Sequence, residues 1–314
     1  MDEGDIRHVP VLCQEVVGYL RPRPGVVIVD ATVGEGGHAR AILQEMEGQG
    51  CLIGLDRDEE ALQKAGERLR DFEPVLMLRQ ANFSSLREVL RDLGVSEVDG
   101  VLLDLGVSSL QLESPQRGFS YRFPGRLDMR MDRSQDLDAW KVVNEYEERE
   151  LARIIREYGE ERWASRIARG IALARKRAPL DTTDRLAEVV KDSIPAAARR
   201  RGGHPARRTF QALRVEVNGE LQNLEAALPQ AAGALKEGGR VVVISYHSLE
   251  DRAVKRFFQS RGSRCACRAD APRCTCGRKE ELRILTAGPV RPERGEVERN
   301  PRSRSAKLRA AEKR

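Results

Sequence analysis

Asp30, Asp56 and Asp104 each stand at the end of a short apolar run in the first third of the chain. The run that ends at Asp30 leads into Gly34–Ala39, which fits the pattern Gly-x-Gly-x-x-Gly/Ala. Glycines at such a turn let the backbone approach a ligand closely. A carboxylate about twenty residues later can accept both hydroxyls of an adenosine ribose. Asp56 lies twenty residues after Gly36, so the spacing indicates a site for a cofactor that contains adenosine.

Asp104 favours S-adenosylmethionine over the nicotinamide dinucleotides, which contain the same sugar. In methyltransferases built on a parallel sheet, the end of the fourth strand lies between the methyl donor and the acceptor, and Asp104 takes that place. A hydride-transfer enzyme would need a nicotinamide site and an acid–base partner, for which the sequence offers no clear arrangement. Any one aspartate could equally be a helix N-cap or a solvent-facing turn. A dehydrogenase and a non-catalytic RNA-binding factor therefore stay open as alternatives.

The elements that must position these aspartates alternate between strands and helices. Apolar runs predict strands at Val26–Val29, Cys51–Leu55, Val75–Leu78, Val101–Leu103 and Arg240–Ile244, and a final pair at Ile284–Leu285 and Ala306–Ala310. Helical spacing predicts helices at Gly37–Met46, Glu59–Arg70 and Ser85–Leu93. The alternation predicts an α/β fold with a doubly wound, mostly parallel sheet. Ligands of such a sheet bind at the carboxyl ends of its strands.

The pattern changes after Ser109. Residues Pro115–Arg133 are rich in Gly, Pro, Arg and Asp, which predicts a functional loop. Only helical periodicity follows over Leu137–Ile194. We therefore expect an inserted all-helical domain over residues 113–205, within a sheet domain made of residues 1–112 and 206–314. One long helix is predicted at Arg207–Leu235.

The charge of the chain is distributed unevenly. The net charge is +6, yet Arg199–Arg214 alone carries +6 and Arg252–Arg314 carries +12, which leaves −12 for the rest. A cationic half is typical of proteins that bind phosphate-rich partners such as RNA, although most charge runs are merely solvated faces. Apolar residues make up 40% of the chain, which argues against a disordered protein.

The chain shows no membrane or secretion signal. No apolar run approaches the ~20 residues that a membrane span needs, and the acidic first ten residues lack the pattern of a signal peptide. We therefore expect a soluble, cytoplasmic protein without a membrane partner. The oligomeric state stays open, with a homodimer among the alternatives.

The six cysteines fit a reducing compartment. Cys13 and Cys51 lie in apolar contexts that favour small core residues. The remaining four form a compact cluster at Cys265, Cys267, Cys274 and Cys276. Four thiols suit tetrahedral zinc, but the Cys-x-Cys spacing is tighter than usual, and a flexible arginine-rich loop with reduced thiols is the alternative. We assign no metal.

Ten motifs, in order over nearly the whole chain, resemble the MraW/RsmH family. They are His8–Val11, Asp30–His38, Gly54–Asp58, Leu102–Ser109, Arg117–Ser120, Leu127–Asp132, Tyr158–Glu161, Arg208–Arg214, Ser245–Arg252 and Asn300–Leu308. The resemblance implies a class I methyltransferase that uses S-adenosylmethionine to methylate N4 of a specific cytidine in 16S ribosomal RNA, at the decoding centre of the small ribosomal subunit. It implies donor-binding positions at Gly36, Gly37, His38, Asp56, Phe83, Asp104 and Gln111.

The expected chemistry assigns further residues to the RNA. A cytosine amine is a poor nucleophile, and acceptors for its N–H groups make its lone pair available; Asp104 and the backbone of Leu105–Gly106 are the candidates, with Asp104 as the catalytic residue. We assign the substrate side to Ser108, Arg117, Phe119, Arg130, Arg208, Arg214, His247, Ser248 and Arg252. The arginines are expected to contact phosphates.

Two further expectations concern the target base. A flipped base needs a surface to replace its stacking partners, for which the aromatic candidates are Phe119, Tyr121, Phe123, Phe210 and Tyr246. Carbon-5 methylation would need a cysteine nucleophile beside the cofactor. Neither Cys13 nor Cys51 follows the active end of a strand, so we reject that reaction.

Overall fold

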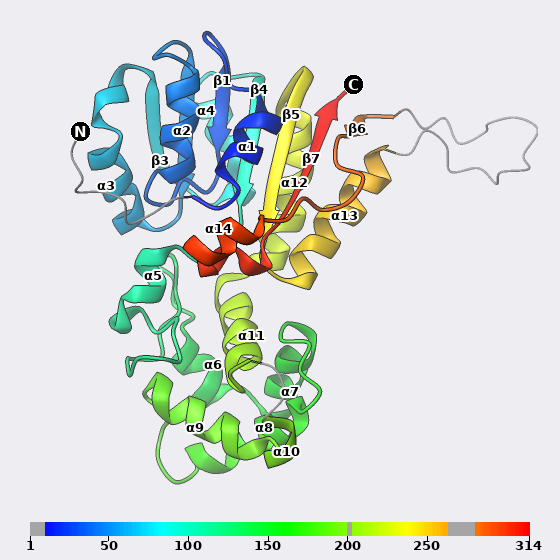
Figure 1. Ribbon diagram of the computed structural model, residues 1–314. Coiled ribbons are helices and arrows are strands. Elements are labelled where there is room, and N and C mark those ends of the chain that lie inside the picture. Colours follow the sequence, from blue (N-terminus) through cyan, green and yellow to red (C-terminus); the bar gives the residue numbers. More distant parts are fainter. Residues whose placement is uncertain (1–9, 200–202, 263–279) are drawn as a thin grey trace, which may run out of the picture. The chain divides into compact units, whose positions relative to one another are not determined.

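The computed structural model describes residues 10–199, 203–262 and 280–314 (Figure 1). The chain forms two compact units, Met1–Gly106 with Leu221–Arg314 and Val107–Glu220, so the second is inserted into the first. The predicted boundaries, 112/113 and 205/206, both lie inside the second unit. The reason is that Val107 and Leu112, before the first boundary, and Ala206, Phe210 and Leu213, after the second, pack in or against the hydrophobic core of that unit.

The first unit contains a seven-stranded sheet in the order β3-β2-β1-β4-β5-β7-β6. Its strands are β1 (Val27–Asp30), β2 (Cys51–Asp56), β3 (Leu76–Gln80), β4 (Val98–Asp104), β5 (Leu235–Ser245), β6 (Leu282–Ile284) and β7 (Lys307–Lys313). Strands β1 to β5 pair in parallel, and β7 pairs antiparallel with both β5 and β6. The predicted doubly wound α/β fold is confirmed, and the chain order reverses between β1 and β4, where such sheets bind ligands.

Helices cover both faces of this sheet. They are α1 (Cys13–Leu20), α2 (Gly37–Glu45), α3 (Glu59–Arg68), α4 (Leu86–Asp92), α12 (Glu220–Ala234) and α13 (Ser248–Gly262). The unit also contains α14 (Arg294–Arg299) and 3-10 turns at Arg70–Val75, Phe83–Ser85 and Pro301–Ser305. Successive strand residues point to opposite faces. Ile28 therefore packs with α1, α2 and α3, and Val29 packs with α4, α12 and α13.

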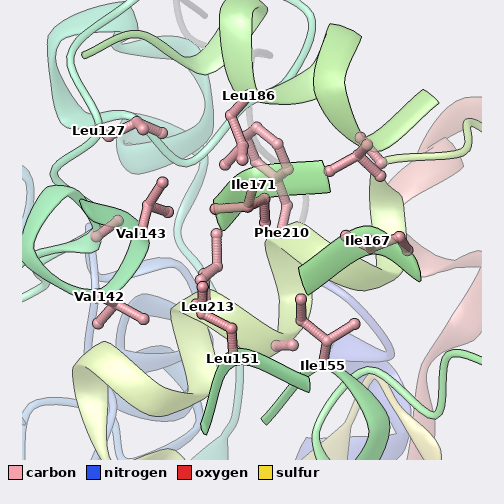
Figure 2. Packing of buried hydrophobic residues seen from close by; sticks show 14 of the residues in the cluster. Leu127, Val142, Val143, Leu151, Ile155, Ile167, Ile171, Leu186, Phe210 and Leu213 are labelled. Carbon is pink, nitrogen blue, oxygen red and sulfur yellow. The ribbon is translucent and has the colours of Figure 1, made fainter. Parts of the chain in front are cut away.

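The regular elements described in the second unit are helices. They are α5 (Ser109–Glu113), a 3-10 turn at Pro115–Arg117, α6 (Ala139–Glu145), α7 (Glu148–Glu157), α8 (Ala164–Arg175), α9 (Thr183–Ser193), α10 (Ala196–Arg199) and α11 (Arg207–Asn218). Figure 2 shows Leu151, Ile167, Leu186 and Phe210, from four different helices, meeting in one core. The expected inserted helical domain is thus present.

The single long helix predicted at Arg207–Leu235 is wrong. Helix α11 ends at Asn218, and Gly219 follows with a left-handed φ of 56°. Glycine adopts this conformation without steric cost and commonly ends helices. The chain passes from the second unit to the first at this point. No helix in the described part of the chain is long and apolar enough to cross a membrane.

Candidate active site at the carboxyl ends of the strands

The glycine-rich turn connects β1 to α2. Gly34 and Gly36 have positive φ values of 52° and 81°, which explains why glycine occupies both positions. A Cβ on Gly36 would lie 3.0 Å from Leu69 Cδ1, whereas one on Gly34 would come near only the Thr32 carbonyl oxygen at 3.9 Å. The turn is therefore packed against α3 on one side and open at Gly34. Its first helical turn in α2 has neither an acidic residue nor a side-chain cap, so its N–H groups suit an anionic group.

Asp56 is fixed at the end of β2 by two backbone groups. Its Oδ2 accepts a hydrogen bond from Gly34 N–H at 2.9 Å, and its Oδ1 accepts one from Asp58 N–H at 2.9 Å. Burial raises the pKa of this carboxyl group, and the two hydrogen bonds oppose the shift. Because a carboxylate offers about four lone pairs, acceptor capacity remains. The open turn and this carboxylate together fit the adenosine part of a methyl donor.

Asp104 is held at the end of β4 by contacts from three segments of the chain. Its backbone N–H donates to Thr32 Oγ1 at 2.6 Å, and its Oδ1 accepts a hydrogen bond from Tyr246 O–H at 2.9 Å. Its Oδ2 lies 3.5 Å from His38 Nδ1, and the side chain is 24% exposed. Burial, reinforced by Glu250, raises the pKa of Asp104 to about 7, against the hydrogen bond from Tyr246. Asp104 can therefore exchange a proton near neutral pH.

His38 faces Asp104 with a defined ring nitrogen. Its Nε2 lies 2.9 Å from the carbonyl oxygen of Val11, which can only accept, so Nε2 carries the hydrogen. Burial lowers the pKa of His38, which favours the neutral ring with a free lone pair on Nδ1. When Asp104 is protonated on Oδ2, His38 Nδ1 can therefore act as an acceptor for that proton. The sequence placed His38 in the donor site and did not predict this pairing.

Asp30 is the last residue of β1, directly before the glycine turn, and is buried. Its Oδ1 accepts a hydrogen bond from Thr32 N–H at 3.2 Å, while its Oδ2 has no partner among the described residues. Burial raises the pKa of Asp30 to about 7, although His38 opposes the shift. The end of β1 thus contains a buried carboxyl group whose protonation state changes near neutral pH.

Sequence reasoning missed the roles of Tyr246 and Glu250. Tyr246 was expected to be an aromatic surface, but its hydroxyl binds Asp104, and burial raises its pKa well above the ordinary value, so that it remains a donor. Glu250 is buried, and its Oε2 accepts hydrogen bonds from the N–H groups of Tyr246 and His247 at 2.8 and 3.2 Å. A carboxylate at the start of a helix is a signal for such capping, and it was available in the sequence at Ser245–Arg252.

The remaining candidates on the donor and base side have local structural roles. Phe83 begins a 3-10 turn after β3 and packs against the sheet core. Ser108 and Gln111 belong to the second unit and form the capping box of α5, with hydrogen bonds of 3.1 and 3.2 Å. His247 Nε2 lies 3.1 Å from Glu250 Oε1. Ser248 begins α13. Their predicted ligand contacts stay predictions.

The predicted phosphate contacts divide into buried and exposed groups. Arg117 is only 2% exposed, and its Nη2 donates to the carbonyls of Arg130 and Met131. Its side chain therefore packs within the second unit and is not accessible to a phosphate of the RNA. Phe119 is likewise a core residue at 7% exposure, which corrects its expected role as a stacking surface.

The other four arginines are placed differently. Arg130 makes a two-pronged ion pair with Asp128, and Arg214 makes one with Glu220. Both are mostly buried, which argues against the expected phosphate contact. Arg208 and Arg252 are exposed on α11 and α13, where a phosphate contact remains open to them. The cysteine cluster at 265–276 lies outside the described residues.

Known proteins resemble this chain over nearly its whole length. Residues 5–314 match the model of the MraW methylase family. The ribosomal RNA small subunit methyltransferase H of Symbiobacterium thermophilum is 53% identical over 306 residues, which cover 98% of this chain and 96% of that protein. The protein of the same name from Heliobacterium modesticaldum is 51% identical over 307 residues and covers 98% of both chains. That from Halothermothrix orenii is 47% identical over 308 residues, 98% of this chain and 99% of that protein. Because a family model and close relatives both extend over nearly its whole length, the chain belongs to the MraW methylase family.

Proposed function

We propose that this chain transfers a methyl group from S-adenosylmethionine to N4 of a specific cytidine in 16S ribosomal RNA, at the decoding centre of the small ribosomal subunit. Membership of a methylase family supports methyl transfer. The name of the relatives, ribosomal RNA small subunit methyltransferase H, supports a ribosomal RNA substrate. The choice of an amine rests on Asp104, whose two carboxylate oxygens lie next to Tyr246 O–H and His38 Nδ1 at the end of β4.

The donor site is the turn of β1 with the end of β2. Backbone groups at Gly34–Gly37 would hold the donor, and Asp56 would accept hydrogen bonds from its ribose hydroxyls. When bound, S-adenosylmethionine supplies an electrophilic methyl group on a sulfonium. Asp56 keeps its orientation without the donor, because Gly34 and Asp58 already hold both of its oxygens. A site formed in advance reduces the cost of binding.

Asp104 performs the chemistry on the acceptor side. Its carboxylate accepts a hydrogen bond from the cytosine amine, which favours a nitrogen with an available lone pair. As the nitrogen gains the methyl group it becomes acidic, and Asp104 takes the proton. A pKa of about 7 suits this step because the group is then partly ionised and can release the proton again at neutral pH. Tyr246 keeps the carboxylate oriented, and His38 Nδ1 shares the proton.

Methylation at carbon 5 finds no support in the described cysteines. Cys51 is the first residue of β2, at the opposite end of the strand from Asp56, and Cys13 begins α1. Burial raises the pKa of both thiols, which disfavours the thiolate that this reaction requires. Membership of a methylase family argues against the dehydrogenase alternative. We propose the cytoplasm, where ribosomal RNA is found, as the compartment.

The test is to identify the product. The purified protein is incubated with labelled S-adenosylmethionine and naked 16S RNA, small subunits or whole ribosomes, and the nucleosides are separated and identified by mass spectrometry. We expect N4-methylcytidine, and 5-methylcytidine or an unmodified RNA would refute the proposal. Asp104→Asn should reduce the rate at least 100-fold with unchanged RNA affinity. Asp92→Asn, which alters an exposed carboxylate on α4, is the control and should retain activity.

A further inference from the structure

One face of α8 in the second unit is strongly cationic. Residues 162–177 contain six basic and no acidic residues. At about 100° per residue, positions 166, 169 and 173 of α8 fall within an arc of about 60°. We name Arg166 and Arg169 of α8, together with Arg162 just before the helix and Lys176 and Arg177 just after it, the α8 cationic face; all five are exposed. Ile167 and Ile171 point to the opposite side, into the core drawn in Figure 2.

The charges of this face are not balanced within the protein. Neighbouring helices pair their arginines with their own carboxylates, as Arg153 does with Glu150 and Arg185 with Glu188. No residue of the α8 cationic face has an ion-pair partner in the described ranges 10–199, 203–262 and 280–314. Like charges three or four residues apart on a helix repel one another. An external polyanion would relieve this repulsion.

Trp163 holds the first two cations of the face. Its ring centroid lies 4.8 Å from the guanidinium carbon of Arg162 and 5.6 Å from that of Arg166. Such contacts restrain an arginine while leaving its N–H donors free for a phosphate. Leu173 lies in the same stripe and is 55% exposed, so it can contact a sugar or base. The apolar side of α8 is buried in the core, which removes the surface that a membrane-binding helix would insert.

We propose that the α8 cationic face binds the phosphate backbone of the RNA substrate. Helix α8 has 12 residues and is therefore about 18 Å long, and the face continues into the residues that flank it, which is enough for several consecutive phosphates. Phosphate contacts of this kind add affinity and orientation without reading sequence. That the RNA is ribosomal rests on the proposed function, whereas the evidence for a phosphate-binding surface comes from the α8 cationic face itself. The sequence had located the positive charge elsewhere, at Arg199–Arg214 and Arg252–Arg314.

The test compares two triple variants of equal net charge. One is Arg166→Gln, Arg169→Gln, Lys176→Gln on the face. The matched control changes Arg91, Arg185 and Arg294 to Gln, three exposed arginines that are paired with carboxylates on their own helices. Binding to 16S RNA and to small subunits is measured by filter retention at about 50 to 200 mM KCl, because affinity that depends on phosphate contacts falls steeply over this range. Methylation rates are measured in parallel.

We expect the face variant to bind RNA at least tenfold more weakly at 100 mM KCl. The negative slope of log affinity against log salt should become smaller in magnitude by about 2 to 3, since each of the three lost phosphate contacts contributes about 0.7 to 0.9. The KM of the face variant for RNA should rise, while its kcat should stay within twofold of the wild-type value. RNA affinity, KM and kcat of the control variant should each change less than twofold. If the face variant folds poorly, the double variant Lys176→Gln with Arg177→Gln, directly after α8, should still weaken RNA binding about threefold.

The outcomes separate this proposal from the proposed function. If the wild type methylates RNA and both variants bind RNA as tightly as the wild type, the role of the α8 cationic face is refuted and the proposed function stands. If the wild type methylates no RNA but the face variant alone loses RNA binding, the surface stands and the function is refuted. Binding to phosphatidylglycerol vesicles is measured as well. If the face variant loses only that binding and keeps its affinity for RNA, the α8 cationic face serves a membrane and the proposal is overturned.

Discussion

Replacing Tyr246 by Phe should shift the pH dependence of methyl transfer. The change removes only the hydroxyl that donates to Asp104 Oδ1 at 2.9 Å, and it keeps the ring that lies against Gly106. A hydrogen bond to a charged group contributes about 1.5–3 kcal/mol, and 1.36 kcal/mol corresponds to about one pH unit. Loss of the bond therefore raises the pKa of Asp104 from about 7 to roughly 8–9.

The assay measures kcat at saturating RNA and S-adenosylmethionine between pH 6 and 10. Only the ionised carboxylate can take the proton, so activity rises with pH through the pKa of Asp104. The wild type should reach half its maximal rate near the pKa of about 7, and Tyr246→Phe should reach it roughly one to two pH units higher. At neutral pH the variant should be about 5- to 50-fold slower, and it should recover in alkali.

A matched control and a clear negative result complete this prediction. Tyr19→Phe removes a hydroxyl from the partly buried Tyr19 of α1 and should leave the pH profile unchanged. An equal loss of rate at every pH, with an unshifted profile, would mean that Tyr246 acts only through packing. An unchanged rate would mean that Asp104 does not take the proton.

Two further predictions concern stability and the donor site. Burial raises the pKa of Asp30 to about 7, so between pH 4 and 7 the folded state keeps a proton that the unfolded state releases. The free energy of unfolding should therefore fall with rising pH, and this group should contribute up to about 4 kcal/mol to the decrease. In urea denaturation, Asp30→Asn should lose much of that decrease. If the free energy of unfolding of the variant depended on pH as in the wild type, the raised pKa of Asp30 would be contradicted. Gly36→Ala, with its φ of 81° and a Cβ 3.0 Å from Leu69, should destabilise the protein by about 1–3 kcal/mol and weaken S-adenosylmethionine binding in calorimetry. Gly48→Ala, with a φ of 68° and open space around it, carries the backbone strain alone and should bind the donor normally.

The amino-acid sequence was sufficient to predict the sheet and the edge at which the candidate residues lie. Short apolar runs between helical segments indicate parallel strands, and the carboxyl ends of such strands meet at one edge. Asp30, Asp56 and Asp104 could therefore be placed together, and the glycine turn could be placed beside them. These features depend on residue type and short-range spacing. The break at Gly219 had a local signal as well, but the apolar spacing on both sides concealed it.

Only the tertiary structure decided how the charged groups are paired. Asp104 and Tyr246 are 142 positions apart, and nothing in the sequence near either residue indicates their hydrogen bond. Arginine is usually exposed, yet Arg117 is buried, whereas Arg166 and Arg169 of α8 are exposed and have no ion-pair partner in the described residues. The physical reason is that burial and ion pairing depend on which distant segments pack together. Local spacing determines helices and strands, but a side chain's surroundings, and with them its pKa and its partners, come from residues far away in the chain.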